Sequence, residues 1–417
     1  MKKFGCLSLV ILLFICFCGC DKKTEVETVY EEVVSTNSQT TSAPDQPGSS
    51  IDVSSQPTGS SAQTDTPTSD SAKPDEQPDN TVQEGVYMLN DESVLAKVKL
   101  NGRCEKTIIG VSLGMSGSAI EFNTTSSAVM LEANCAAGIY YNIVVDGVVT
   151  YERQVTESGT NYIILARNLS SGTHNIKLIR DCEGRNDMRF NAVSLQLDDG
   201  ELLARDTDKV VIEFLGDSIT GGFGNLIDNG VSNPLELKNQ SVMKAYPYLV
   251  ASKLGYDYRI VAQSGIALAK REGYLPFIDY YKCENYHLDK NKEYTSSSPK
   301  DVDIVVVNLG TNDIGSELYD TENPEHIHAY EKYYADLITS IGYNKDTKIL
   351  FISDVWYHDP AITDGGVVKE LNSRGYNNVY TMKLNKYKSG GGSHPSGKEH
   401  QEIANLIINY FKSNGIA

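Results

Sequence analysis

The sequence has little positive charge and lacks the short motifs of several ligand classes. Its 417 residues include 37 Lys and Arg against 55 Asp and Glu, which gives a formal net charge of -18. That balance, with no basic cluster to offset it, argues against nucleic acid as a partner. No C-x-x-C pair indicates a zinc site, and neither G-x-G-x-x-G nor a Gly-Lys-Ser/Thr loop indicates a bound nucleotide. We therefore expect no metal and no cofactor.

The amino-terminal segment has the pattern of an export signal. Two lysines precede an apolar run, residues 4–20, that is too short to span a membrane comfortably. The run ends in Phe17–Cys20 (FCGC), which resembles a bacterial lipobox, whose last cysteine is lipidated after cleavage. We predict a lipoprotein signal peptide over 1–20, a lipid anchor on Cys20, and a place on the bacterial cell surface or membrane, outside the cytoplasm. An ordinary signal peptide or a short anchor helix is the alternative interpretation.

The eight cysteines divide between two parts of the chain. Three precede Cys20 and would leave with the signal peptide. Cys104, Cys135, Cys182 and Cys283 remain, and an exported protein can pair such residues. Their disulfide state does not follow from the sequence.

Residues 21–84 have the composition of a disordered linker. The stretch 35–84 is rich in Ser, Thr and Pro and contains no aromatic and almost no aliphatic residues. Such a segment buries too little apolar surface to offset the entropy of ordering. We predict a flexible tether between the anchor and the rest of the chain.

Between residues 85 and 203, short apolar or alternating runs follow one another at close spacing. Asp146-Gly147 separates two of them, 141–145 and 148–155, and is a strong signal for a hairpin turn. Several short strands with no helical period predict an antiparallel β-sandwich of the jelly-roll type. Its last strand is expected within 188–197.

From residue 204 to residue 417, buried strands alternate with longer segments of helical spacing. The apolar runs cover 209–216, 258–265, 303–313 and 348–356. This alternation predicts an α/β domain, a parallel sheet with helices on both faces in three layers. In such sheets, ligands bind beyond the carboxyl ends of the strands.

Residues that can carry chemistry follow these runs at the expected edge of the sheet. Ser218 comes just after the first run, while Gly265 and Asn312 close the second and third. His394 lies in a loop before a predicted carboxyl-terminal helix. Gly-Asp-Ser alone is ordinary turn chemistry, so a nucleophile at Ser218 requires these partners.

Together these positions resemble the four sequence blocks of the SGNH, or GDSL-type, hydrolases. The blocks are Gly216-Asp217-Ser218, Gly265, Gly310-Thr311-Asn312-Asp313 and His394-Pro395. They occur in the family's order and cover roughly the last half of the chain. The longer stretch 216–225, GDSITGGFGN, preceded by a jelly roll, is similar to carbohydrate esterase family 2, the two-domain polysaccharide deacetylases.

The resemblance implies a role for each block. Ser218 would be the nucleophile, and His394 would take its proton and return it to the leaving sugar hydroxyl. The backbone N–H groups of Ser218 and Gly265 and the side-chain amide of Asn312 would form the oxyanion hole.

One position departs from the family pattern. Related enzymes commonly carry an Asp two or three residues before the histidine, where this chain has Gly391 and Gly392. One interpretation is a Ser-His dyad in which a backbone carbonyl orients the His394 ring. The other is that activity is weakened or lost.

The remaining histidines and the single tryptophan offer alternatives. His358 follows a predicted strand and is a rival for the base. His326 and His328 suggest a metal at first sight, but no further ligand spacing accompanies them. Trp356 fits a sugar subsite or the protein core equally well.

These observations favour a surface-tethered, monomeric acetyl esterase. It would remove O-acetyl groups from plant polysaccharides such as xylan or mannan. The alternatives are an SGNH esterase acting on peptidoglycan or small acyl esters, and a catalytically inactive glycan-binding lipoprotein, which the missing Asp would favour.

The anchor is testable in cells. Cys20→Ser should abolish lipid attachment, because the thiol that accepts the lipid is gone, and the protein should leave the detergent phase after phase separation. Partition of the mutant like that of the wild type would show that another feature anchors the chain.

Overall fold

The computed structural model describes residues 85–185, 188–206, 209–228, 236–270, 275–285, 289–314, 319–353 and 356–417. The predicted signal peptide, the lipidation site Cys20 and the predicted linker lie outside these ranges. Within these ranges, no helix combines the length and the apolar character needed to cross a membrane.

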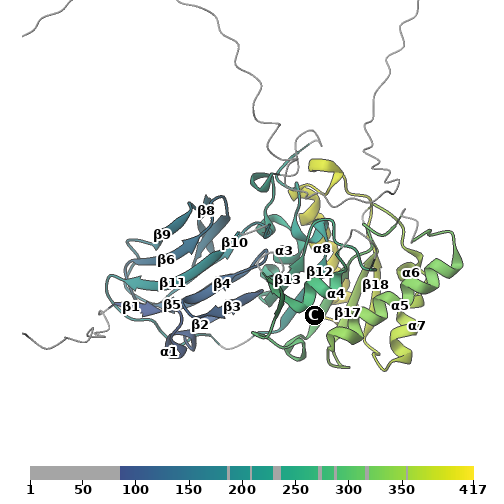
Figure 1. Cartoon of the computed structure of the whole chain (residues 1–417), viewed down its shortest axis with the longest axis horizontal. Helices are drawn as coiled ribbons and strands as arrows, with labels where there is room; N and C mark the ends of the chain where they lie inside the picture. Colours follow the sequence, from purple (N-terminus) through teal and green to yellow (C-terminus); the bar gives the residue numbers. More distant parts are fainter. Residues whose placement is uncertain are drawn as a thin grey trace, which may run out of the picture. The chain divides into compact units, whose positions relative to one another are not determined.

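Two antiparallel sheets form a sandwich in the amino-terminal half of this part (Figure 1). One sheet has the order β3-β4-β11-β6-β9, with β1 paired to β11, and the other has the order β2-β5-β10-β7-β8. A short helix, α1 (Glu92–Leu95), connects β1 to β2. The strands are β1 (Val86–Met88), β2 (Val98–Asn101), β3 (Cys104–Thr107), β4 (Gly110–Leu113), β5 (Ala119–Thr124), β6 (Val129–Cys135), β7 (Tyr140–Val145), β8 (Val148–Val155), β9 (Gly159–Ala166), β10 (His174–Arg180) and β11 (Phe190–Leu197). The predicted antiparallel sandwich is confirmed.

The hairpin between β7 and β8 shows how local sequence sets the pairing. Asp146 and Gly147 both have positive φ, 51° and 78°, as a two-residue turn of type I′ requires. Val145 and Val148 flank this turn and pair with each other. The predicted hairpin is therefore present where the sequence placed it.

The carboxyl-terminal half is built on a five-stranded parallel sheet with the order β13-β12-β16-β17-β18. Its strands are β12 (Val211–Gly216), β13 (Asp257–Ala262), β16 (Ile304–Asn308), β17 (Lys348–Ser353) and β18 (Val379–Lys383). The helices are α2 (Ser218–Gly221), α3 (Tyr246–Leu254), α4 (Phe277–Lys282), α5 (Pro324–Ile341), α6 (Pro360–Thr363), α7 (Gly366–Ser373) and α8 (Gly397–Ser413). A two-stranded hairpin, β14 (Cys283–Asn285) with β15 (Asp289–Glu293), follows α4.

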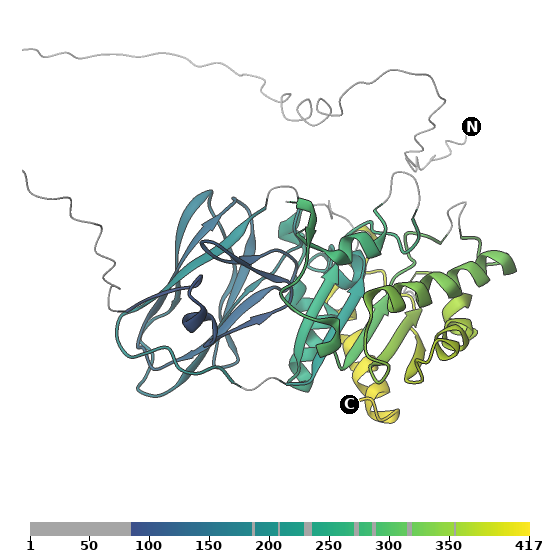
Figure 2. The ribbon, with the colours of Figure 1, turned by 60° about the horizontal axis from the view of Figure 1, so that its bottom comes forward.

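The helices cover the two faces of this sheet, and the alternation of side chains along each strand assigns the faces. In β12, Leu215 packs in the core under α4, α5, α6 and α7, whereas Ile212 and Phe214 pack in the core under α3 and α8. Figures 1 and 2 show these helix groups on either side of the strands. The predicted three-layer α/β domain is confirmed, and its central strands are fully buried because both faces are covered.

The sandwich packs on the α/β domain along the edge strand β13. The Gly102 N–H donates to the carbonyl of Tyr258 at 3.1 Å, and the Tyr258 hydroxyl donates to the carbonyl of Gly117 at 2.9 Å. Lys99 forms an ion pair with Asp257 at 2.5 Å. These contacts cover an edge of the parallel sheet that would otherwise expose unpaired backbone groups.

A second contact between the two domains lies beneath the segment that follows Ser218. Asp181, fully buried after β10, accepts hydrogen bonds from the Ser241 hydroxyl at 3.0 Å and the Met243 N–H at 2.9 Å. Arg153 on β8 contacts the same carboxylate at 2.7 Å. Ser241 in turn exchanges two hydrogen bonds with the side chain of Asn225. The sandwich therefore supports the GDSITGGFGN stretch from behind.

Four cysteines remain as buried thiols in the described structure, where no disulfide joins them: Cys104, Cys135, Cys182 and Cys283. Burial raises the pKa of Cys135 to about 12 and also raises the pKa of Cys182. Both thiols therefore stay protonated and serve as small apolar core residues.

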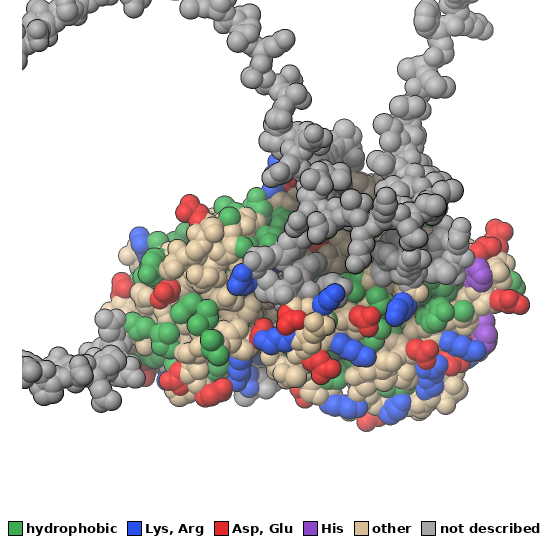
Figure 3. All heavy atoms as spheres, viewed as in Figure 1, with side chains coloured by type: hydrophobic (Ala, Val, Ile, Leu, Met, Phe, Trp, Pro, Cys, Tyr) green, Lys and Arg blue, Asp and Glu red, His purple; other side chains and the backbone are tan. Residues whose placement is uncertain are grey.

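Charged side chains of both signs are interspersed on the face of the α/β domain seen in Figure 3.

Candidate active site

Ser218 lies at the point where the first parallel strand ends. β12 stops at Gly216, and Ser218 begins the single-turn helix α2. The Asp217 carboxylate caps this helix by accepting the Ile219 N–H at 3.0 Å. A side chain at Gly216 would place Cβ only 1.9 Å from the Thr220 hydroxyl, so the close return of the chain requires glycine. Ser218 is thereby held, 6% exposed, at the carboxyl edge of the sheet.

His394 is the histidine that the structure brings to this serine. Its Nε2 lies 2.8 Å from the Ser218 Oγ, although 176 positions separate the two residues in the chain. The loop that carries His394 precedes α8, whose first turn has the capping box of Ser396 and Glu399. This distance is that of a normal hydrogen bond, suited to proton transfer from the hydroxyl to the ring.

A backbone carbonyl, not a carboxylate, faces the other ring nitrogen. The Gly392 oxygen lies 3.1 Å from His394 Nδ1. A carbonyl can only accept, so it selects the tautomer with the proton on Nδ1 and leaves Nε2 free to accept the Ser218 proton. Of the two interpretations that the missing Asp left open, the geometry matches the Ser-His dyad.

Two aromatic rings pack against the imidazole. Phe223 lies 4.7 Å from the His394 ring centroid, and Trp356 lies 4.8 Å away in an edge-on arrangement. Burial lowers the pKa of His394 below its ordinary value of 6.5, and the carbonyls of Gly392 and Gly391 offset part of that effect. The ring is therefore neutral near pH 7, the state that a general base needs.

The nucleophile segment and the histidine loop are tied together by their backbones. The Gly391 N–H donates to the Gly224 carbonyl at 2.9 Å, and the Gly397 N–H donates to the Asn225 carbonyl at 2.8 Å. Gly224 has φ of 65°, and a Cβ there would come within 2.6 Å of the Gly391 oxygen. The glycines of GDSITGGFGN thus permit the close approach that puts His394 beside Ser218.

Gly265 and Asn312 lie next to each other at the same edge. The N–H of Ile266 donates to the Gln263 carbonyl at 3.3 Å, closing a turn in which Gly265 has φ of 77°. The Asn312 amide donates one hydrogen to the Ile266 carbonyl at 2.8 Å. An amide nitrogen carries two hydrogens, so one remains for an oxyanion.

One cleft of about 500 Å³ contains all four residues of the predicted chemistry, Ser218, Gly265, Asn312 and His394. Trp356 also lines the cleft and is half-buried against the core under α8. It therefore lies both in the cleft and against the protein core, the two locations that the sequence left open. The arrangement contains the groups that an acyl-transfer site needs: a hydroxyl, an imidazole in contact with it, and N–H donors nearby.

Sequence reasoning missed the contribution of the sandwich to this cleft. Glu183 and Arg185, in the loop between β10 and β11, line it together with Phe223 and Gln263. The charged pair stands in no recognisable motif, and only the packing of the two domains brings it to the cleft. Phe223 could have been predicted from the sequence, because it lies within the GDSITGGFGN stretch.

The other histidines lie elsewhere. His358 is exposed and contacts the Thr363 hydroxyl at 3.1 Å, so it does not serve Ser218 in this structure. His326 and His328 lie in the first turns of α5, where His328 pairs with Glu331 at 2.9 Å. No group of three metal-ligating side chains occurs in the described ranges.

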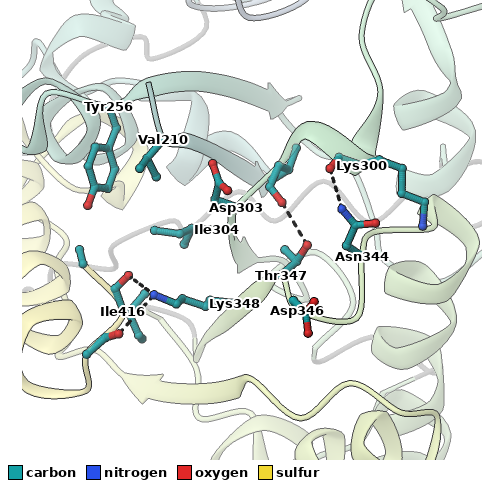
Figure 4. A pocket seen from close by; sticks show the side chains of 13 residues that line it. Val210, Tyr256, Lys300, Asp303, Ile304, Asn344, Asp346, Thr347, Lys348 and Ile416 are labelled. Atoms are coloured by element: carbon teal, nitrogen blue, oxygen red, sulfur yellow. Dashed lines mark hydrogen bonds between the residues drawn. The ribbon is translucent and has the colours of Figure 1, made fainter. Parts of the chain in front are cut away.

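A second pocket, of about 490 Å³, lies at the amino ends of the same strands (Figure 4). Two of its polar side chains bond to the protein itself: Lys348 donates to the carbonyl of Ile416 at 2.8 Å, and Thr347 donates to that of Val302 at 3.0 Å. None of the predicted site residues lines this pocket.

Comparison with known proteins agrees with this arrangement. Residues 100–205 match the carbohydrate esterase 2 N-terminal family, and residues 214–386 match the GDSL-like lipase/acylhydrolase family. Residues 214–386 thus form a GDSL-type hydrolase domain, in the domain order of carbohydrate esterase family 2. The second match ends before His394, whose place in the site therefore rests on the geometry.

Individual relatives of this GDSL-type hydrolase are carbohydrate esterases. It is 30% identical over 219 residues to an acetylxylan esterase/glucomannan deacetylase of Cellvibrio japonicus, covering 50% of this chain and 61% of the relative. It is 24% identical over 325 residues to a cellulase/esterase of Acetivibrio thermocellus, covering 73% of this chain and 38% of the relative. The chain thus spans less than two thirds of the length of either curated relative.

A solved structure supports the fold of this hydrolase. An acetyl xylan esterase from Butyrivibrio proteoclasticus superposes with a TM-score of 0.67 at 21% identity, covering 79% of this chain and 97% of that one.

The two members of the dyad should fail together when mutated. Ser218→Ala and His394→Ala should each lower hydrolysis of p-nitrophenyl acetate by at least about a thousandfold, and the double mutant should be no slower. His358→Ala is the matched control and should hydrolyse the ester like the wild type, because His358 does not touch Ser218. An active His394→Ala beside an inactive His358→Ala would show that His358, and not His394, is the base.

The pH dependence should reflect the buried ring. Activity requires neutral His394 and is lost as the pH falls through its pKa, which burial places below 6.5. The acidic limb of the kcat/KM profile should therefore have its midpoint below 6.5, measured with a neutral ester substrate. A midpoint above that value would contradict the effect of burial.

Proposed function

We propose that this GDSL-type hydrolase is a carbohydrate O-acetyl esterase that removes acetyl groups from plant polysaccharides such as xylan or mannan. The observation that carries the proposal is the 2.8 Å contact between the Ser218 hydroxyl and His394 Nε2, in a cleft that also contains Gly265 and Asn312. The Cellvibrio japonicus relative, an acetylxylan esterase/glucomannan deacetylase, supports the choice of substrate.

The first half of the reaction transfers the acetyl group to the enzyme. The Ser218 oxygen attacks the ester carbonyl carbon while its proton moves to His394 Nε2. The resulting oxyanion accepts hydrogen bonds from the N–H groups of Ser218 and Gly265 and from the Asn312 amide. Collapse breaks the bond to the sugar oxygen, which leaves as a hydroxyl with the proton from His394.

The second half returns the enzyme to its starting state. A water molecule gives its proton to His394 Nε2 and attacks the acetyl carbon on Ser218. Collapse of this second tetrahedral species releases acetate and returns the proton to the Ser218 oxygen. The same donors stabilise both oxyanions, so no additional group is required.

Aromatic surface in the cleft suits a sugar. Trp356 and Phe223 line the cleft beside the reacting pair and offer apolar faces of the kind on which pyranose rings pack. We assign Trp356 to a sugar subsite next to the acetyl position.

An inactive glycan-binding lipoprotein is the second candidate, because no Asp accompanies His394 in its own loop. The Gly392 carbonyl supplies the orientation that the Asp would give, which favours the enzyme.

We also propose that the enzyme is held at the bacterial surface, as a monomer, by a lipid on Cys20 and the tether 21–84. The FCGC pattern and the composition of the tether support this proposal. Such an anchor would keep the cleft within reach of polysaccharide outside the cell.

Acetate release is the deciding measurement. The purified enzyme should release acetate from acetylated xylan or acetylated glucomannan, and Ser218→Ala should release none while still binding the polysaccharide. Hydrolysis of p-nitrophenyl acetate without release from either polysaccharide would indicate a small-ester esterase. Polysaccharide binding without any release by the wild type would indicate the glycan-binding protein.

A further inference from the structure

A carboxylate of the sandwich reaches the turn that carries Gly265. Glu183 is 1% exposed, and its Oε2 accepts the N–H of Ser264 at 3.0 Å. Ser264 directly precedes Gly265, so the hydrogen bond acts on the peptide unit adjacent to the one that presents the Gly265 N–H. The peptide unit that follows Gly265 is also held, because the Ile266 N–H donates to the Gln263 carbonyl.

The charge of Glu183 is balanced within its own loop. Arg185 contacts the Oε1 oxygen through Nη2 at 2.6 Å and through Nε at 2.9 Å. One carboxylate oxygen therefore receives the guanidinium, and the other is directed to Ser264. Both oxygens of the buried carboxylate therefore have hydrogen-bond partners, as a buried charge requires.

The loop that presents Glu183 is itself held rigidly. Arg180, fully buried at the end of β10, donates to the backbone carbonyls of Cys182 at 3.2 Å and Glu183 at 3.4 Å. It also donates to the carbonyls of Leu113 at 2.8 Å and Met188 at 3.0 Å. Asp181, on the same loop, anchors the segment behind Asn225.

We propose that Glu183 is a positioning residue for the esterase reaction: the sandwich, through this side chain, holds the Ser264-Gly265 turn in the orientation in which the Gly265 N–H points at the oxyanion. The inference rests on the proposed function and deepens it. The sandwich is then a component of the catalytic centre, in addition to packing against the α/β domain.

The physical reason is preorganisation. An oxyanion donor contributes only where it is aimed before charge develops, and removing one donor typically costs about a hundredfold or more in rate. A donor that is present but free to rotate loses part of that contribution, and misplacement by about 1 Å can cost on the order of a hundredfold. Gly265 is exposed and lacks a side chain, so its orientation depends on the hydrogen bonds around it.

The experiment compares Glu183→Ala and Glu183→Gln with the wild type on p-nitrophenyl acetate, a small ester that does not need a sugar subsite. Glu183→Ala removes the acceptor and should lower kcat by about tenfold to a hundredfold with little change in KM. Glu183→Gln keeps an oxygen that can accept the Ser264 N–H, and it should retain most of kcat.

The matched control is Asp199→Asn. Asp199 is also a sandwich carboxylate that accepts a backbone N–H, that of Ser127 at 2.6 Å, but its partners lie within the sandwich. Its variant should keep the wild-type kcat. A melting temperature measured for each variant separates loss of fold from loss of positioning.

The pH profile reports separately on the charge of Glu183 near His394. The elements packed around His394 carry these titratable or charged side chains: Glu183 and Arg185 in the same cleft, Asp217 next to Ser218, and Glu399 and His400 on α8. Burial lowers the pKa of His400 to about 3, so this ring stays neutral. The Glu183 charge raises the pKa of His394 against the effect of burial. Both Glu183 variants should therefore shift the acidic limb of kcat/KM to lower pH.

The outcomes distinguish this inference from the proposed function. If the wild type hydrolyses the ester and Glu183→Ala keeps its kcat, the positioning role is wrong while the esterase stands. If Glu183→Ala does not fold, Glu183→Asp replaces it, because the shorter side chain withdraws the acceptor from the Ser264 N–H and keeps the charge; a wild-type kcat in that variant would overturn the inference. If the wild type hydrolyses no acetyl ester, the labelling rate of Ser218 with a fluorophosphonate replaces kcat in the same comparison, and equal rates for wild type and Glu183→Ala would overturn the inference.

Discussion

The pairing of the nucleophile segment with the histidine loop is the constraint on which the site depends. Two backbone hydrogen bonds, from Gly391 to Gly224 and from Gly397 to Asn225, lie on either side of His394. They hold two segments that are distant in the chain at the distance where Ser218 and His394 can share a proton. Because Gly224 lies against the Gly391 carbonyl, a larger residue there would separate the loops. The glycine content of GDSITGGFGN therefore serves this approach as well as the local turn.

The His394 loop shows how a histidine can be oriented without a carboxylate in its own loop. A hydrogen bond to a charged group contributes roughly 1.5–3 kcal/mol and a neutral one about 0.5–1.5 kcal/mol. Replacing the carboxylate by the Gly392 carbonyl thus costs on the order of 1 kcal/mol, or about fivefold in rate. Presenting the wrong tautomer costs about ten-thousandfold in a related catalytic arrangement. The Gly392 carbonyl preserves the tautomer with the proton on Nδ1, so the ten-thousandfold loss is avoided and only the smaller loss from the weaker hydrogen bond remains.

The sandwich and the α/β domain share the support of the cleft. One loop after β10 carries both Asp181, which anchors the segment behind the nucleophile, and Glu183, which contacts the turn before Gly265. Arg180 fixes this loop through four backbone carbonyls. Both sides of the reacting pair are therefore braced from the same element of the neighbouring domain.

The sequence by itself determined the elements and the residue types of the site. Alternation and turn chemistry, such as Asp146-Gly147, indicated the sandwich, and the buried runs indicated the parallel sheet, because these signals are local. Ser218, Gly265, Asn312 and His394 were predictable because each follows a recognisable strand or precedes a recognisable helix. Only the tertiary structure decided which group faces His394 Nδ1, since a backbone carbonyl leaves no mark in the sequence. It also decided where Glu183 and Arg185 lie, because their contact with the cleft arises from packing between two domains and not from any spacing along the chain.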